Sequence, residues 1–324
     1  MVELASSPNN IRYNGTGRAY AGEVAGSSFF DLGELENINL AVEASTESLQ
    51  SARNAARGNI IERESERSAN LSFGLREMTN QNLRMALLGS AISTANQAAS
   101  GVLQASKTWV DDLYIDLGKI NVFVTKLTGS VTGTMAAGDT VTGSVSGATG
   151  KIAFLGADHI VVVEVSGGPF QTGEDAYVTE STDYLGSITA VETFEDVCIT
   201  DAAGDTRRVN GTDYTLDPDY GYVRKLSTGS MAADDVVSFD HEAVDIDYFH
   251  GMSAGSVERR VIFVTDKDDQ GPRFRYTFHK VQINLNGEFP LLGEGASILS
   301  VSGSVLKDTT QPAGQEYFKK EIMG

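Results

Sequence analysis

The chain has 324 residues, of which 41% are hydrophobic and 21% are charged, and its formal net charge is −19. This composition is typical of a globular protein and excludes a largely disordered chain. The acidic balance argues against a general basic surface for nucleic acid or anionic membranes. The single cysteine, Cys198, cannot form an intramolecular disulfide, which favours folding inside the cell.

No stretch approaches the roughly 20 apolar residues of a membrane helix, and MVELASSPNN does not resemble a signal peptide. We therefore expect no contact with a membrane. The charge is concentrated in the middle of the chain. Residues 109–255 hold 24 acidic and 7 basic residues, whereas the two flanking segments together hold 20 and 18. A change in composition of this kind indicates a separately folded middle region.

The first strands are predicted at 28–32 and 37–42. The next segment, 43–69, has few large apolar residues and alternating charges. It predicts either a solvated helix or flexible loop, or a protruding loop that meets a partner through mixed charges. Both interpretations stay open, because a connection longer than about 12–15 residues is usually functional or disordered.

Alternation over residues 71–75 predicts a strand, which is followed by a short helix over 80–88. Thr79 has the character of its N-cap, and Gly89 ends the apolar pattern. The Ala- and Ser-rich residues 90–108 predict a linker or a weak helix.

Residues 128–193 predict a small all-β domain of roughly SH3-like barrel size, with short strands separated by Gly, Asp and Pro. Residues 194–250 form a further β segment that belongs either to this insertion or to the core. GTMAAGDTV at 133–141 is echoed by GSMAADDVV at 229–237. The echo suggests that the chain enters a hairpin in the same way twice.

Residues 273–304 predict a long, two-faced β-hairpin. Aromatic residues alternate over 274–278, and aliphatic residues alternate in the opposite phase over 281–285. The change of phase at His279-Lys280 predicts a β-bulge or a bend, because one extra residue must enter the ladder. Asn286-Gly287 is suited to a turn.

No pattern for catalysis or metal binding has the required spacing. The four histidines are scattered, and 147–151 lacks two essential residues of a phosphate loop. Residues 266–271 lack the closing Glu of a calcium loop and predict a polar hairpin tip. Asp245 and Asp247 share a strand face that is expected to be solvated. We therefore predict no enzyme, no catalytic residue, no metal site and no cofactor.

Three segments together resemble one family. They are DLGELENINL at 31–40, ANLSFGLREMTNQNLRMALLGS at 69–90 and HKVQINLNGEFPLLGEGASILSVSGSVLKD at 279–308. In this order they resemble the major tail tube proteins of long-tailed (siphovirus-like) bacteriophages. In that family a strand ending in a glutamate, here Glu77, leads into a short helix whose motif is here Gln81-Asn82-Leu83-Arg84. The family's C-terminal "Leu-x-Asp" is here Leu306-Lys307-Asp308.

The resemblance, over about residues 28–90 and 257–308, implies an all-β fold: a β-sandwich with one short flanking α-helix and a long β-hairpin. It implies homohexameric rings that stack into a tube for DNA ejection, through which DNA passes without specific binding. The implied partners are further copies of the chain and, at the tube ends, tape measure and tail terminator proteins. The protein would be made and assembled in the host cytoplasm and would belong to the virion tail.

On this basis the tail-tube core comprises residues 1–127 and 251–324, with 128–193 inserted on the outside of the tube. Residues 307–324 are polar and predict a C-terminal extension of the chain. The candidate ring-stacking residues lie in the polar segment: Arg53, Arg57, Glu62, Arg63, Glu64, Glu66 and Arg67. The candidate ribbon or lumen residues are Asp266, Asp268, Asp269, Arg273, Arg275, Lys280 and Gln282.

Basic side chains in the lumen would bind the phosphates of DNA, whereas a lumen that conducts DNA must not bind it. Arg273 and Arg275 therefore require either nearby carboxylates or partners at a subunit interface, and both solutions stay open. A different function class is also open: a multi-domain β-rich binding protein or adhesin that recognises glycans or a host surface. This alternative predicts exposed aromatic platforms in residues 128–245, whereas the single tryptophan, Trp109, lies outside them.

Overall fold

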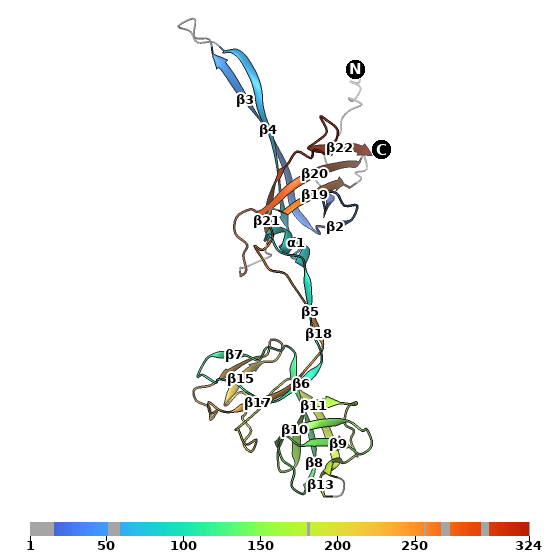
Figure 1. The fold of residues 1–324 in the computed structure, drawn as a ribbon, viewed down its shortest axis with the longest axis vertical. Coiled ribbons are helices and arrows are strands. Elements are labelled where there is room, and N and C mark those ends of the chain that lie inside the picture. The colour runs from blue at the N-terminus through green and yellow to red at the C-terminus, as the bar shows by residue number, and fades with distance from the viewer. Residues whose placement is uncertain are drawn as a thin grey trace, which may run out of the picture. The chain divides into compact units, whose positions relative to one another are not determined.

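The computed structural model describes residues 16–50, 59–179, 182–255, 257–266, 273–292 and 298–323. Within these ranges the chain is nearly all β, with 22 strands and one helix, which confirms the predicted fold class (Figure 1). Two compact units share the chain: unit 1 is Met1–Ser93 with Asp247–Gly324, and unit 2 is Thr94–Ile246. The chain passes between them in β5 (Ser93–Gln97) and β18 (Val244–Tyr248), which pair with each other.

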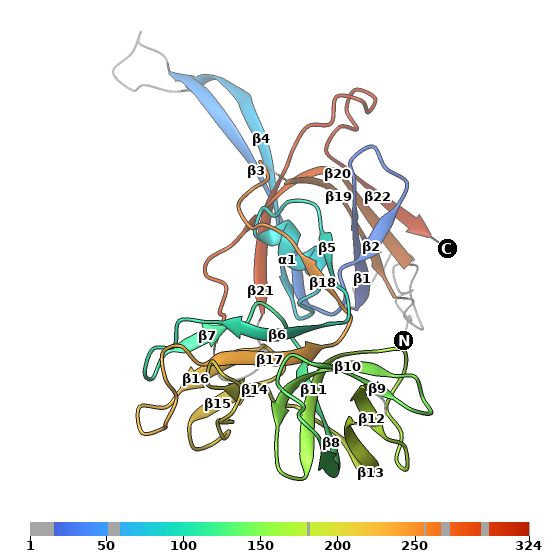
Figure 2. The ribbon, with the colours of Figure 1, turned by 60° about the horizontal axis from the view of Figure 1, so that its bottom comes forward.

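Unit 1 is built on an eight-stranded sheet in the order β2-β1-β19-β20-β21-β4-β3, and β22 pairs with β20 outside this path. The bounds are β1 Gly17–Gly22, β2 Phe29–Asp31, β3 Leu35–Gln50, β4 Asn59–Leu75, β19 Val257–Thr265, β20 Arg273–Leu285, β21 Leu299–Val305 and β22 Phe318–Met323. The late strands β19, β20 and β21 lie between the early strands β1 and β4, and Figure 2 shows blue and red strands in one sheet. Its core therefore needs both ends of the chain.

The single helix, α1 (Asn80–Ala86), begins where the sequence predicts it. The Thr79 hydroxyl accepts a hydrogen bond from the Asn82 backbone N–H at 3.2 Å, which caps the helix. The buried Asn82 side chain donates to the carbonyls of Leu32 and Glu77, at 3.0 and 2.9 Å. The motif that carries the family resemblance thus ties the helix start to the end of β2.

A β-bulge occupies the predicted position in β20. Arg259 of β19 pairs with Val281, and Val261 pairs with Phe278, so one residue of β19 lies opposite two of β20 between these pairs. The extra residue lies at His279-Lys280 and confirms the bulge prediction. Because the bulge resets the alternation, Phe278 and Val281 both reach the buried core of unit 1.

The predicted hairpin over 273–304 is only half correct. β20 pairs with β21 at Val281–Leu285, whereas Arg273–Phe278 pairs with β22. Residues 307–324 therefore contain a strand as well as a polar segment. The Phe318 ring lies 5.7 Å from the Phe278 ring and anchors β22 to the core.

The polar segment 43–69 also differs from its prediction in the part that the structure describes, since residues 43–50 and 59–69 are strands and not a helix or a loop. Glu43–Gln50 continues β3, and Asn59–Ala69 begins β4. These strands pair antiparallel along their whole length, with three register shifts. We refer to Val42–Gln50 together with Asn59–Ala69 as the arm. Figure 1 shows the arm extending beyond the other strands of unit 1.

Unit 2 contains a closed barrel of six strands in the order β8-β11-β10-β9-β12-β13, because β11 also pairs with β8. The bounds are β8 Val122–Thr132, β9 Thr140–Gly143, β10 Thr149–Leu155, β11 His159–Ser166, β12 Ala176–Thr179 and β13 Asp183–Phe194. Its interior is filled by aliphatic side chains such as Leu127, Ile152 and Ile160. The predicted small barrel is therefore confirmed, with β8 as its sixth strand.

The rest of unit 2 surrounds a second core. β17 (Val236–His241) pairs with β8, β14 and β6, and a separate three-stranded sheet has the order β15-β16-β7. The remaining bounds are β6 Ser100–Ser106, β7 Tyr114–Asp116, β14 Cys198–Thr200, β15 Tyr214–Asp217 and β16 Tyr222–Lys225. Trp109, Tyr214 and Phe239 are the large buried side chains of this core.

The units divide the chain at 93/94 and 246/247, whereas the sequence analysis divides it at 127/128, 193/194 and 250/251. Residues 94–127 belong with the middle of the chain because Trp109 and Val124 pack in one cluster with Val197 and Tyr214. Residues 90–108, expected as a linker or weak helix, supply the strands β5 and β6.

The similar sequences at 133–141 and 229–237 form the same kind of turn. The Asp139 carboxylate accepts from the Ala136 backbone N–H at 2.8 Å, and Asp235 accepts from Ala232 at 3.0 Å. β9 and β17 begin directly after these aspartates. The expected similarity is therefore confirmed for the turn, but only β9 goes on to form a hairpin, with β10, whereas β17 pairs with β8, β14 and β6.

Candidate functional site

The arm exposes large apolar side chains at positions where a strand of a monomer normally carries polar ones. Val42 is 63% exposed, Leu49 61% and Ile61 55%. Leu49 and Ile61 are directly opposite each other across the two strands, so they form one apolar pair. An isolated two-stranded ribbon is at best marginally stable in water. These features are typical of a surface that another molecule covers.

Five of the seven candidate ring-stacking residues lie on this arm. Glu62, Arg63, Glu66 and Arg67 are exposed on β4, and Glu64 is in the same strand. The register places Arg63 opposite Glu47, Arg67 opposite Ala44 and Glu64 opposite Thr46. Arg53 and Arg57 lie outside the described residues.

An apolar groove lies at the root of the arm. Its volume is about 180 Å³, and it is lined by Ile38, Leu40, Leu71, Phe263, Tyr276 and Phe278. The pairs Ile38–Phe73, Leu40–Leu71 and Val42–Ala69 share one face of β3 and β4. The exposed Val42 therefore continues the apolar stripe of the groove into the arm. Alternation at residues 38, 40 and 42 was visible in the sequence, but the exposure of its last member was not.

The basic candidates of β20 find carboxylates within the same chain. Arg275 forms a hydrogen-bonded ion pair with Glu321 of β22, with its Nε 2.6 Å from Oε2. Lys280 Nζ lies 2.9 Å from Glu258 Oε2. Of the two solutions left open for Arg273 and Arg275, the chain therefore uses a nearby carboxylate for Arg275, and Lys280 is compensated in the same way.

The other ribbon candidates are less closely grouped. Arg273 is exposed and lines a cavity of about 320 Å³ that also includes Asp266 and Arg18. Gln282 pairs in register with Glu258 and Ser304. Asp268 and Asp269 lie outside the described residues.

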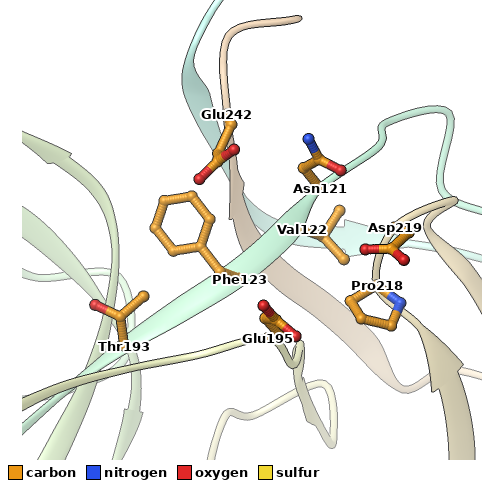
Figure 3. Close-up of a pocket in the computed structure, with 8 residues that line it drawn as sticks. All are labelled: Asn121, Val122, Phe123, Thr193, Glu195, Pro218, Asp219 and Glu242. Atoms are coloured by element: carbon orange, nitrogen blue, oxygen red, sulfur yellow. The ribbon is translucent and has the colours of Figure 1, made fainter.

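Unit 2 has a separate open cavity of about 420 Å³. Figure 3 shows the Phe123 ring between the carboxylates of Glu242 and Glu195, with Asp219 also at the rim. All three carboxylates are exposed to solvent. Within the described ranges, no three His, Cys, Asp or Glu side chains are arranged to hold a metal ion.

The remaining candidates for chemistry are dispersed. The His159 ring is 2.8 Å from Asp158, whereas His241 and His279 are buried, and burial lowers the pKa of both imidazoles. Asp245 accepts a hydrogen bond from the Asn96 side chain at 2.6 Å. The described part of the chain contains no helix with the length and apolarity of a membrane span.

Comparison with known protein families gives a match that covers nearly the whole chain. No curated protein matches the sequence. A family model matches residues 12–166 and 174–319, which include most of both units. The chain therefore belongs to the family described as Protein of unknown function UCP028589.

Proposed function

We propose that the protein is a structural subunit of a bacteriophage tail tube, in which homohexameric rings stack into a conduit for DNA. The observation that carries this proposal is the arm, whose apolar side chains Val42, Leu49 and Ile61 are each more than half exposed. The resemblance described above supplies the identity of the assembly. The structure supplies surfaces suited to self-association.

Burial of these side chains provides a driving force for stacking. Complete burial of a Val, Leu or Ile side chain contributes about 1.5–3 kcal/mol. Since these three are already partly covered, each would add roughly 1 kcal/mol when a neighbour covers the rest. The contribution of one arm is modest. A ring presents several arms at once, so the affinity between two rings greatly exceeds that of a single arm for its receptor.

Two further features support contacts within a ring. β2 and β3 end the strand order of the unit 1 sheet, so their outer edges carry backbone groups able to pair with another chain. Contacts between different edges of identical subunits are heterologous, and they close into a ring when the rotation is suitable. The groove at the arm root provides an apolar receptor of matching character on each copy.

The charge distribution fits a conduit that does not bind DNA. Unit 1, which would form the tube wall, holds 21 acidic and 17 basic residues. Arg275 and Lys280 are compensated by Glu321 and Glu258. Because acidic residues outnumber basic ones in this unit, the wall would release little counterion on contact with phosphates and so would bind DNA weakly.

The test compares the native protein with the triple variant Val42→Ser, Leu49→Ser, Ile61→Ser by negative-stain microscopy and light scattering. We expect the native protein to form rings or tubes. The variant should form shorter tubes or single rings with an unchanged melting temperature, because the replaced side chains lie on the surface. The matched control replaces Val145 and Val209, which are 73% and 56% exposed in unit 2, by Ser.

A native protein that stays monomeric at high concentration under several ionic conditions would refute the proposal. Tubes of native length from the triple variant would instead remove the arm from the stacking contact. The charge variant Arg63→Glu, Arg67→Glu separates the two kinds of contact on the arm, since it should impair stacking without loss of thermal stability.

A further inference from the structure

The three-stranded sheet of unit 2 has one buried and one aromatic face. Ile115 and Val223, which are opposite each other in β7 and β16, pack toward the core around Trp109. The neighbouring positions point outward and carry Tyr114 and Tyr222. We refer to Tyr114, Arg224, Tyr222 and Tyr220 together as the tyrosine row.

The members of the row share one face of the sheet. Tyr114 is opposite Arg224, and the Arg224 guanidinium carbon lies 5.8 Å from the centre of the Tyr114 ring. Tyr222 is two residues from Arg224, and its ring is 6.3 Å from that of Tyr220 with only 16° between the planes. The exposed fractions are 66% for Tyr114, 41% for Tyr222 and 63% for Tyr220. Three aromatic rings therefore lie along one surface in contact with water.

The backbone beneath the row is fixed before any ligand arrives. The Asp217–Gly221 turn is held by hydrogen bonds from Asn121 N–H to the Asp219 carbonyl, at 3.2 Å, and from Leu117 N–H to the Gly221 carbonyl, at 3.0 Å. Gly221 has a φ of +65°, and a Cβ there would lie 1.9 Å from the Lys119 carbonyl oxygen. A fixed turn reduces the entropy lost when an aromatic surface binds.

Polar groups surround the rings. Asp116 and Asp217 are both opposite Tyr222, on the two strands that flank it. Arg224 Nη2 is 3.2 Å from Asp112 Oδ1, so this arginine is oriented and its charge is compensated. On this face, flat aromatic rings therefore lie next to carboxylates and next to the planar guanidinium group of Arg224. A protein interface instead has an apolar core from which charged residues are depleted.

This arrangement selects a ligand that is flat and apolar on one face but rich in hydroxyl groups at its rim. A sugar ring has these properties: its C–H groups stack on an aromatic face, and its hydroxyls bond to carboxylates and guanidinium. Nucleic acid bases also stack on aromatic rings, but their phosphates need a positive surface. Unit 2 holds 23 acidic and 8 basic residues, which disfavours polyanions.

We infer that the tyrosine row is a binding site for neutral saccharides. The site lies wholly within unit 2 and does not use the arm, so it adds a function to the tail-tube proposal and does not depend on it. Saccharide binding and tube formation are separate measurements on the same protein, and the failure of one leaves the other standing.

The experiment measures the electrophoretic mobility of the full-length protein in native gels that contain dextran, soluble starch or hydroxyethyl cellulose, together with a glycan array. We expect at least one neutral glycan to retard or capture the native protein and heparin to have no effect. The double variant Tyr220→Ala, Tyr222→Ala should bind at least about tenfold more weakly, because it removes two stacking surfaces. Tyr222→Phe should keep most of the affinity, because it retains the ring.

Tyr248→Ala is the matched control, since Tyr248 is 42% exposed but is not part of the row. Trp109 fluorescence and the melting temperature verify that each variant is folded. Absence of binding to every neutral glycan, or equal binding by the double variant and the native protein, would overturn the inference. Capture of heparin with no neutral glycan bound would do so as well.

Discussion

Replacement of Asp240 by Asn tests the electrostatics of unit 2. Asp240 lies in β17, is only 4% exposed and accepts a hydrogen bond from the Glu164 backbone N–H at 2.6 Å. Burial raises the pKa of its carboxyl from 3.8 to about 6. The backbone N–H groups of Glu164 and Val165 oppose this rise, and the charge of Glu164 adds to it.

The sign of the pH dependence follows from the direction of the shift. Because the folded pKa lies above the unfolded value, protonated Asp240 stabilises the fold fully below about pH 3.8, and this contribution is lost as the pH rises through about 6. A difference of about two pKa units corresponds to about 3 kcal/mol. The Asn variant has no such titration. We therefore expect the native-minus-variant unfolding free energy to fall by about 3 kcal/mol between about pH 3.5 and pH 7.5.

Urea unfolding followed by tryptophan fluorescence provides the measurement. Trp109 is the only tryptophan in the chain and is buried in the same cluster as Phe239, so its emission reports on unit 2. A constant offset between the two proteins, such as a lost hydrogen bond, does not affect the expected slope. The control is Asp234→Asn, an exposed carboxylate of the same unit. A difference independent of pH would refute the reasoning.

Two further predictions concern buried groups of unit 2. Glu174→Ala should lower the melting temperature of unit 2 strongly, because the Glu174 carboxylate accepts from the backbone N–H groups of Val145, Ser146 and Gln171 at 2.9, 2.7 and 2.6 Å. Hydrogen bonds to a charged group contribute about 1.5–3 kcal/mol each, and the variant loses all three. A melting temperature within about one degree of the native value would contradict this. Burial raises the pKa of the Cys198 thiol to about 12, so iodoacetamide should label the native protein slowly and the urea-unfolded protein fast. Equal rates would show that β14 is not buried.

The features predicted correctly from the sequence are those encoded within a few residues. The Thr79 cap needs only its own hydroxyl and a nearby N–H group. The bulge at His279-Lys280 is visible as a change of phase within a single strand. The turns ending at Asp139 and Asp235 repeat because one carboxylate reaches a backbone N–H three residues earlier.

The features missed depend on contacts between distant segments. In the arm both faces are wet, so residues 43–69 lack the apolar alternation by which a strand is recognised. The tyrosine row carried a partial signal in Tyr220-Gly221-Tyr222, but Tyr114 joins it only through the pairing of β7 with β16. β22 was missed because its exposed lysines conceal Phe318, the residue that anchors it.

The interleaved strand order of unit 1 has a consequence for synthesis on the ribosome. β1 pairs with β19, which follows the whole of unit 2 in the chain. Unit 2 is continuous, so it can complete its fold first, while the sheet of unit 1 must wait for the last strands. The β3–β4 hairpin can form early, but its supporting sheet cannot. An unfinished chain therefore lacks the complete sheet of unit 1 until its last strands have been synthesised.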